Sequence, residues 1–249
     1  MRILTIFLLY LSNANFCIAQ AFYTLPPGFD FDLRTLYYDS TSKELFAGGP
    51  LQKLFDSTGN GLPVNYVAKW SNNSWSSIDG GFSGHTFVLI KHNTNIMAGG
   101  VCGKLDSTGI SYANYLTQYN GAVWSNFDSL IPNSAVYGML SHGNDIYIGG
   151  SFTQISGTPA VCLAKYNGTT LTIFPGFSTN DNVTSLIFYN NTLFAGGNFL
   201  GTGTPSDFAF WDSSNFTWQQ VGTGFSGAFS GVNDLKIFQN KLYVCGLMH

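Results

Sequence analysis

The stretch TLFAGGNF (192–199) places two adjacent glycines inside an otherwise good β-strand. Glycine weakens the interior of a strand, so a glycine pair there needs a structural reason. The same phrase recurs as ELFAGG, NIMAGG and DIYIGG, and in altered form as KLYVCG. The second glycines stand at positions 49, 100, 150, 197 and 246, which gives spacings of 51, 50, 47 and 49 residues. Repeats of this length are typical of propellers and solenoids.

Each period contains four short runs with the composition of strands. In the unit that begins at Val183 they are VTSLIF, TLFAGG, FAFW and TWQQVGTGF, with a tight turn after the first and a variable loop after the second. Four strands per unit is the composition of a propeller blade. We therefore predict an all-β fold, a β-propeller of about five four-stranded blades, in which the last blade is incomplete or the chain is truncated.

The two ends of the mature chain carry parts of this unit. The residues FYTLPPGF (22–29) match in length the fourth runs WSSIDGGF (75–82) and WQQVGTGF (218–225). The last residues, 232–246, supply only the first two runs of a unit. We expect a lone fourth strand near the start and a lone hairpin near the end, which either close a shared blade or mark the front part of a longer chain.

The glycine pairs follow from the crowding that a propeller imposes. The first runs of the units, such as FVLI (87–90) and SLIF (185–188), are apolar without strict alternation, as in strands covered on both faces. Tight turns rich in Asn and Gly follow them, as at Asn93-Thr94 and Asn190-Asn191. Inner strands press against the axis and the next blade, so we predict that the glycines allow close approach there.

The third and fourth runs place aromatic residues on both sides of a short polar turn. The phrases are KWSNNSW (69–75), QYNGAVW (118–124), KYNGTTL (165–171) and FWDSSNFTW (210–218). Each is predicted to be a hairpin with large side chains on both strands. We expect these rings to pack between blades, and the alternative is a row of tryptophans that stacks on sugars.

The N-terminus has the features of a secretory signal. Arg2 precedes the apolar run ILTIFLLYL (3–11), and Cys17-Ile18-Ala19 provides a small-residue cleavage site before Gln20. We predict a signal peptide over 1–19 and a propeller domain over 20–249. The apolar run is too short to cross a bilayer, and we expect no membrane span in the mature chain. The predicted location is secreted or at the cell surface.

Charge and cysteine content narrow the classes of partner. Only 9% of residues are charged and the formal net charge is −3, so no basic stripe is available for nucleic acid. Removal of Cys17 leaves Cys102, Cys162 and Cys245, at three different positions of the repeat. We expect each to be a small buried apolar side chain rather than half of a disulfide or a metal ligand.

The repeats resemble a known family. LFAGG…VAKWSNNSWSSIDGGF and IYIGGSF…LAKYNGTT are similar to the repeats of kelch-like, galactose-oxidase-type propellers, especially secreted bacterial repeat proteins with GG and W phrases and the fungal cortical cell-polarity marker. Trp211 and Trp218 match the kelch spacing, whereas the other aromatic pairs lie closer together. The resemblance implies a propeller used for extracellular or surface interaction, and it assigns no catalytic residue.

The ionisable residues form no recognisable catalytic or metal-binding pattern. His92 and His142 flank tight turns, where a solvated surface position is expected, and the four histidines show no metal-ligand spacing. The loops DSTGNG (56–61) and DSTGI (106–110) lack the alternating acidic ligands of a calcium loop, so we interpret them as turns. We predict no catalytic residue, no metal and no cofactor.

If a ligand-binding site exists, we place it at the axis-facing entrance before each first strand. Asp32, His85 and Asn182 hold equivalent positions there, together with Gly231, and Asp181 lies beside them. A general acid and base pair would need two carboxylates, and only Asp32 and Asp181 are present, on distant repeats. The alternative is that these residues line a water-filled channel.

These observations favour a non-catalytic, secreted propeller that binds an extracellular protein or a glycan through its loops. Two other functions stay open. One is a glycan-active hydrolase, lyase or oxidase with its site at the axis, and the other is a passive spacer in a larger surface protein. Further repeats or a C-terminal domain in a longer parent chain are compatible with all three.

Overall fold

The computed structural model describes residues 28–55, 58–101, 103–105, 111–113, 115–127, 130–199, 207–222 and 231–247. These residues form strands and loops and no helix, so none of them forms a helix that could cross a membrane. The predicted signal peptide, residues 22–27, Cys102, and the aspartates that begin the two DSTG stretches lie outside the described residues.

The described residues build four four-stranded antiparallel sheets, called blades one to four below, and four two-stranded sheets, of which one is a separate hairpin after blade four. Blade one has the order β1 (Thr35–Asp39), β2 (Glu44–Gly48), β5 (Val67–Ser71), β6 (Ser74–Ser77). Blade two has the order β7 (Thr86–His92), β8 (Asn95–Gly100), β11 (Leu116–Tyr119), β12 (Trp124–Asn126). Blade three has the order β13 (Val136–His142), β14 (Asp145–Gly150), β17 (Leu163–Tyr166), β18 (Leu171–Ile173). Blade four has the order β19 (Asn182–Tyr189), β20 (Thr192–Asn198), β21 (Phe208–Asp212), β22 (Thr217–Gln220), and the hairpin consists of β23 (Gly231–Phe238) and β24 (Lys241–Leu247).

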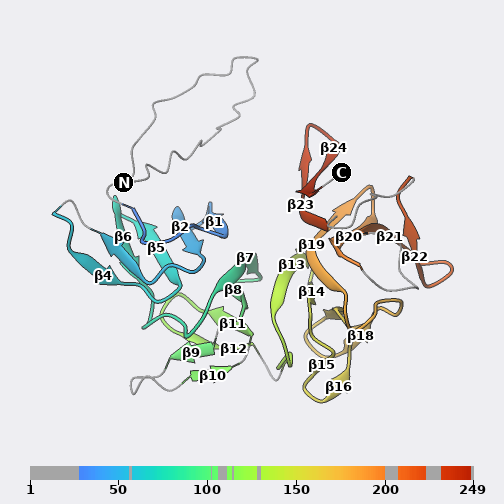
Figure 1. Ribbon diagram of the computed structural model, residues 1–249, viewed down its shortest axis with the longest axis horizontal. Helices are drawn as coiled ribbons and strands as arrows, with labels where there is room; N and C mark the ends of the chain where they lie inside the picture. The colour runs from blue at the N-terminus through green and yellow to red at the C-terminus, as the bar shows by residue number, and fades with distance from the viewer. Residues whose placement is uncertain are drawn as a thin grey trace.

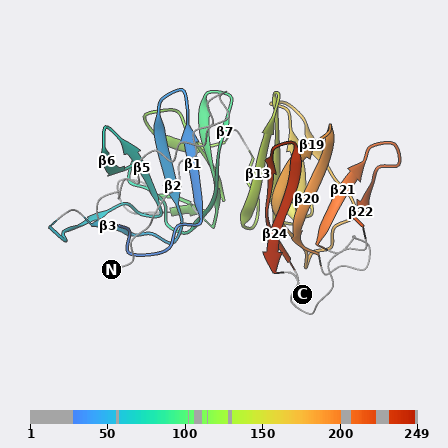
Figure 2. The same cartoon turned by 90° about the horizontal axis from the view of Figure 1, so that it is seen from above.

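The blades stand around a common centre. In Figure 1 the first strands β7, β13, β19 and β23 lie nearest the middle of the molecule, while the fourth strands β12, β18 and β22 lie outside. Each first strand contacts the first strand of the next blade. Figure 2 shows the molecule turned by 90°, so that the first strands β1, β7, β13 and β19 are seen along their lengths. The arrangement is propeller-like, which confirms the all-β prediction and the four-stranded unit.

The variable loop is the part of the unit that the sequence interpretation missed. In blades one to three this segment folds into a two-stranded ribbon rather than an irregular loop. The ribbons are β3 (Lys53–Phe55) with β4 (Gly61–Pro63), β9 (Gly103–Leu105) with β10 (Ser111–Ala113), and β15 (Gln154–Ile155) with β16 (Thr158–Pro159). Leu54 and Ile155 explain two of them, because each ribbon buries one apolar side chain against its blade.

The two glycines of each pair serve different contacts. A Cβ on the first glycine would meet a β-branched side chain from the next blade: 2.7 Å from Thr86 at Gly48, and 2.6 Å from Val183 at Gly149. A Cβ on the second glycine would instead meet the carbonyl oxygen that precedes the first strand of the same blade, as at Gly150. The predicted close approach is therefore confirmed, both between blades and within each blade.

The aromatic residues pack both across their own hairpin and between blades. Trp70 lies directly opposite Trp75, with ring centroids 5.6 Å apart. Phe82, which follows blade one, packs edge-on against Trp124 of blade two at 4.7 Å. Phe174, at the end of blade three, meets Trp211 of blade four at 4.9 Å. The rings join neighbouring blades, which confirms the predicted interblade packing.

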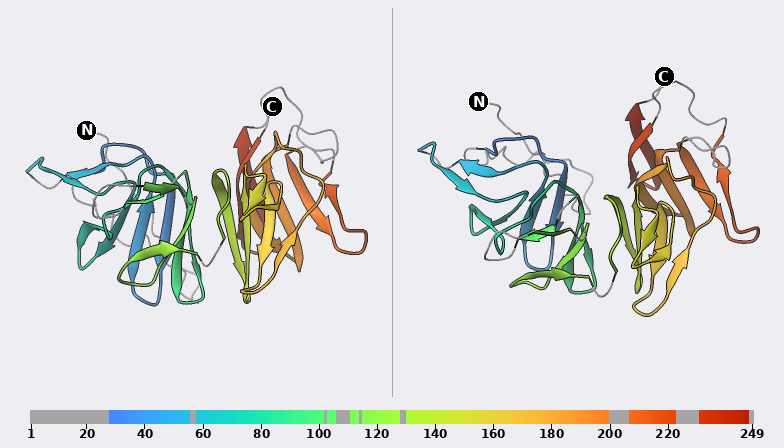
Figure 3. Two further views of the ribbon diagram at one scale, coloured as in Figure 1. Left: turned by 90° about the horizontal axis from the view of Figure 1, so that it is seen from below. Right: turned by 60° about the horizontal axis from the view of Figure 1, so that its bottom comes forward.

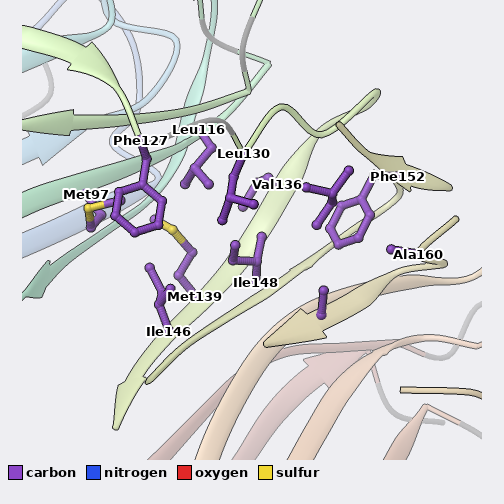
Figure 4. Close-up of a cluster of buried hydrophobic side chains, with 12 residues drawn as sticks. Met97, Leu116, Phe127, Leu130, Val136, Met139, Ile146, Ile148, Phe152 and Ala160 are labelled. Carbon is purple, nitrogen blue, oxygen red and sulfur yellow. The ribbon is translucent and has the colours of Figure 1, made fainter. Parts of the chain in front are cut away.

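One buried cluster fills the junction between blades two and three. It includes Met97 and Leu116 of blade two, Val136 and Met139 of blade three, and Phe127, which follows β12. Figure 4 shows Phe127 beside the sulfur-bearing side chains of Met97 and Met139. These two blades are therefore held together by a continuous apolar core.

The turn ends of the first strands carry a second set of interblade contacts: one ion pair, one stacked pair of rings and two hydrogen bonds between different groups. The residues concerned occupy the last position of one first strand and, in the first three contacts, the second-last position of the next. The contacts are the ion pair Asp39–Lys91, the hydrogen bond between His92 Nδ1 and Ser141 Oγ (2.8 Å), the stacked pair His142–Phe188 (4.1 Å), and the hydrogen bond from Tyr189 Oη to the carbonyl of Asn240 (2.9 Å).

The ion pair gives a pH-dependent contribution to stability. Lys91 Nζ lies 2.9 Å from both carboxylate oxygens of Asp39. Burial acts to raise the pKa of Asp39, but hydrogen bonds from Lys91, the Thr41 N–H and Ser42 outweigh it, so the pKa is lowered. A lowered pKa in the folded state means that the ion pair stabilises the protein above the unfolded-state pKa and ceases to do so as the pH falls through the folded-state pKa.

We expect Asp39→Asn to reduce the free energy of unfolding by about 1 to 2 kcal/mol at pH 7, because a charge-assisted hydrogen-bond network is lost. Urea unfolding of both proteins across the pH range measures this. The difference between them should be constant at neutral pH and shrink below about pH 3.9, the usual pKa of aspartate. A difference that persists unchanged in strong acid would contradict this role of Asp39.

Candidate functional site

The structure places the predicted entrance residues at equivalent positions. The carbonyls of Asp32, His85 and Asn182 each lie against the second glycine of their own blade, and Gly231 does the same in the hairpin. The side chains differ in environment: those of Asp32 and His85 are exposed and that of Asn182 is half-buried. The repeat alignment of this entrance is thus confirmed at the level of the backbone.

Aromatic rings surround His85 at this end of the molecule. Its imidazole lies 5.7 Å from the ring of Tyr66 and 6.2 Å from that of Phe87. Phe87 in turn meets Tyr137 of blade three at 5.1 Å. Phe87 and Tyr137 occupy irregular positions, where the pairing register of the first two strands shifts by one residue. His85 therefore belongs to an aromatic row that crosses from blade two to blade three.

Asp181 occupies a different environment from its neighbours in the prediction. Its side chain is only 1% exposed, and its carboxylate accepts a hydrogen bond of 2.7 Å from the Ser178 N–H. Its carbonyl accepts a hydrogen bond from the thiol of Cys162, at 3.1 Å. These contacts give Asp181 a role in holding the loop before β19.

The cysteines show one agreement and one correction. Cys162 is buried, as expected, and burial together with the nearby Asp181 raises the pKa of its thiol to about 12. Such a thiol is unreactive at neutral pH. Cys245, by contrast, is exposed, so the expectation of a buried side chain is wrong there. The reason is its position: Cys245 lies on the face of β24 that no described strand covers.

A polar cavity of about 430 Å³ lies at the other end of the first strands. β7 has seven residues, which separates its two ends by about 20 Å, so the cavity and the His85 entrance are on opposite sides of the molecule. Figure 3 shows blade two, in green, beside blade three, in yellow-green, and the cavity lies where their turns meet. The lining residues are His92, Asn93, Thr94, Asn95, Gln118, Phe127, Asn144, Asn167 and Gly168.

The walls of the cavity come from three turns, from the strands β7, β8 and β11, and from Phe127 after β12. Asn93 and Thr94 form the β7–β8 turn, Asn144 precedes β14, and Asn167 with Gly168 forms the β17–β18 turn. Asn93 adopts a φ of 53°, which asparagine tolerates better than most residues. The Asn167 side chain accepts hydrogen bonds from the N–H groups of Thr169 and Thr170, which fixes its turn.

A chain of hydrogen bonds orders the inner wall. Asn95 Nδ2 donates to Gln118 Oε1 at 2.8 Å, and Gln118 Nε2 donates to the carbonyl of Asn126 at 3.1 Å. Each carboxamide has two N–H donors and two acceptor sites on its oxygen, so both side chains keep capacity for a further partner. Phe127 supplies the apolar part of the lining.

His92 corrects a second expectation. The sequence places it beside a tight turn and suggests a solvated side chain, whereas the structure buries it at 5% exposure between blades two and three. Its Nδ1 meets Ser141 Oγ, and its Nε2 meets Asn93 Nδ2 at 3.3 Å. Contact with the next blade, which a single repeat does not reveal, explains this burial. His142, by contrast, is exposed as expected.

Among the described residues, no group of three or more His, Cys, Asp or Glu side chains has the arrangement of a metal site. The cavity itself was missed by sequence reasoning, because its lining is drawn from residues 92–168 in two separate blades. One signal was available: blades one and three place an oppositely charged pair where blade two has Asn95 and Gln118.

Comparison with known proteins supports the fold alone. No family model and no curated protein sequence matches this chain. The solved structure of YjhT is similar over 86% of this chain and 76% of that chain, with a TM-score of 0.52 and 16% sequence identity. This likeness agrees with the all-β, propeller-like arrangement. The resemblance to kelch-like repeats stays a prediction.

Proposed function

We propose that this protein is a secreted, non-catalytic β-propeller scaffold that binds an extracellular protein or glycan. The observation that carries the proposal is the polar cavity between blades two and three. Its volume of about 430 Å³ falls within the usual range for ligand pockets. Two packed blades form its walls, so it is built on a rigid frame.

The chemistry of the lining favours binding over catalysis. Among the described residues that line the cavity, His92 is the only ionisable side chain, and both of its ring nitrogens face partners within the protein. General acid–base catalysis normally uses two positioned ionisable groups. Carboxamides and hydroxyls instead provide hydrogen bonds that orient a ligand.

The propeller we propose has about five blades, with the β23–β24 hairpin as the inner pair of the fifth. Two features of the hairpin support this. Its register shifts between Val232 and Asp234, as the corresponding registers shift in blades two, three and four. Its Gly246 lies against the carbonyl of Gly231, in the same way as the second glycine of each blade.

Binding is tested with the mature chain from residue 20, tagged and applied to a glycan array and to intact cells. We expect saturable retention on one of these surfaces that untagged protein displaces. Absence of saturable retention on both would overturn the proposal. Turnover of an array glycan that is abolished by Asp32→Asn would overturn the non-catalytic assignment, because it would place a reaction at the His85 end.

A further inference from the structure

We propose that the cavity between blades two and three binds the ring of a neutral carbohydrate. This inference rests on the proposed binding function and assigns its ligand class and its site. The equivalent positions in blades one, three and four provide the comparison for the cavity-lining side chains of blade two.

The position in question is a pair of side chains on the second and third strands of each blade. In blade one it is the ion pair Glu44–Lys69, with an N–O distance of 2.8 Å, and in blade three it is Asp145–Lys165, at 3.1 Å. In blade two the same register holds Asn95 and Gln118, joined by a hydrogen bond of 2.8 Å. The link between the second and third strands is therefore kept in blade two, but neither side chain carries a charge.

Only this uncharged pair lines the cavity, whereas the charged pairs do not. In blades one and three an ion pair fills this position, whereas in blade four Thr192 and Phe210 stand there and form no ion pair. Blade two differs from blades one and three in that it keeps the side-chain connection without the charges. The neutral amides in the lining of this cavity fit a ligand that carries no charge. The charged side chains next to the lining in sequence are already neutralised, Lys91 by Asp39 and Asp145 by Lys165.

The hydrogen-bonding character of the lining matches a sugar. Each hydroxyl of a sugar donates one hydrogen bond and accepts others, and a carboxamide offers both functions from one side chain. Five carboxamides line the cavity, from Asn93, Asn95, Gln118, Asn144 and Asn167. The inner two are held in place by the chain of hydrogen bonds that ends at the carbonyl of Asn126.

The remaining lining also fits a sugar ring. Phe127 supplies the apolar part of the lining, and its position is fixed because the ring, which is only 8% exposed, belongs to the core cluster in Figure 4. Asn93, Asn144 and Asn167 are exposed at the rim, where they can reach outer hydroxyls. A free carboxylate or phosphate, in contrast, would meet no unpaired cation in this lining.

Asn167, Gly168 and Thr169 form an Asn-X-Thr acceptor sequence for N-glycosylation. The test therefore uses the mature chain made in a bacterial host, so that Asn167 carries no added glycan. Neutral methyl glycosides of glucose, galactose and mannose, and N-acetylglucosamine, are titrated while the side-chain amide signals of Asn95 and Gln118 are followed by NMR. We expect saturable shifts of both signals with at least one sugar. Methyl glucuronide, which carries a carboxylate, should bind more weakly than methyl glucoside.

The decisive variant is the double substitution Asn95→Asp with Gln118→Lys, which copies the ion pair of blade three. It should fold as the wild type does and bind the sugar at least about ten-fold more weakly, since it removes two neutral amides and adds charges. The matched control is Glu44→Asn with Lys69→Gln in blade one, which should leave sugar affinity unchanged. Asn144→Ala, at an exposed rim position, should weaken binding several-fold without any demand on the fold.

The outcomes separate this inference from the proposed function. Sugar binding that survives both the blade-two double variant and Asn144→Ala would overturn the cavity assignment and leave a glycan-binding function in place. Retention on cells without binding of any neutral sugar would overturn the ligand class while a protein-binding function stands. If the double variant fails to fold, the test rests on two other results. These are the change in sugar affinity caused by Asn144→Ala and the shift of the Asn95 side-chain signal on sugar addition.

Discussion

Gly150→Ala is expected to cost more than about 3 kcal/mol of unfolding free energy, a large part of the stability of an ordinary domain. An added Cβ would lie against the carbonyl oxygen of Ala135, which is backbone of the same blade, and 3.1 Å from the ring of Phe152. That carbonyl already accepts the Ser151 N–H at 3.0 Å. Relief of the clash therefore moves main chain and breaks pairing.

Two other glycines provide the comparison for Gly150. At Gly149 the closest atom to the added Cβ would be a methyl group of Val183 in blade four, at 2.6 Å, and the Val183 carbonyl oxygen would lie farther off, at 3.2 Å. The clash there is less severe than at Gly150, so Gly149→Ala should cost about 1 to 3 kcal/mol. At Gly143 nothing lies within 4 Å and the φ is 59°, so alanine there should cost about 1 kcal/mol. Urea unfolding midpoints give the ranking. A loss at Gly150 no larger than that at Gly143 would remove the explanation given for the second glycine.

Trp124→Ala is expected to cost about 3 to 5 kcal/mol, as for other large aromatic side chains in cores. The side chain is fully buried and packs against Phe82 of blade one at 4.7 Å and Tyr119 of its own blade at 5.2 Å. The substitution therefore removes contacts both within blade two and across the joint with blade one. Thermal and urea unfolding measure the loss.

The neighbouring residue supplies the control for Trp124. Val123 is 44% exposed, and Val123→Ala should change the free energy of unfolding by no more than about 0.5 kcal/mol. Trp124→Phe should lie between the two, since it keeps a ring beside Phe82. Equal effects of Val123→Ala and Trp124→Ala would show that the ring does not join the blades.

The sequence predicted the parts of the fold that repeat. TLFAGG and its relatives identified the second strands, and the crowding expected at their glycines is present at Gly48 and Gly149. The ribbons were missed because their strands are only two or three residues long, too short for any periodicity. Burial of Leu54 and Ile155 against the blades, a tertiary contact, is what shapes them.

The candidate site was harder to predict than the fold. Asp32, His85 and Asn182 were aligned correctly by repeat position. Alignment does not reveal that the Asp181 carboxylate points back into its own loop, where it accepts the Ser178 N–H. The cavity depends on how blade two meets blade three, and no single repeat contains that information. The sequence did contain one difference: Asn95 and Gln118 stand where blades one and three have a charged pair, which becomes visible only when the repeats are compared position by position.

The joints at the turn ends of the first strands have a consequence for how the chain assembles. Near-identical modules in one polypeptide are prone to dock on the wrong neighbour during folding. Here Lys91 pairs with the carboxylate of Asp39, Ser141 hydrogen-bonds to the imidazole of His92, and Phe188 stacks on the ring of His142. A module docked out of turn would bury a lysine without its counter-charge or a ring against a polar partner. Because the contacts differ from one junction to the next, each blade docks specifically on its own neighbour. The order of the blades in space therefore follows their order in the chain.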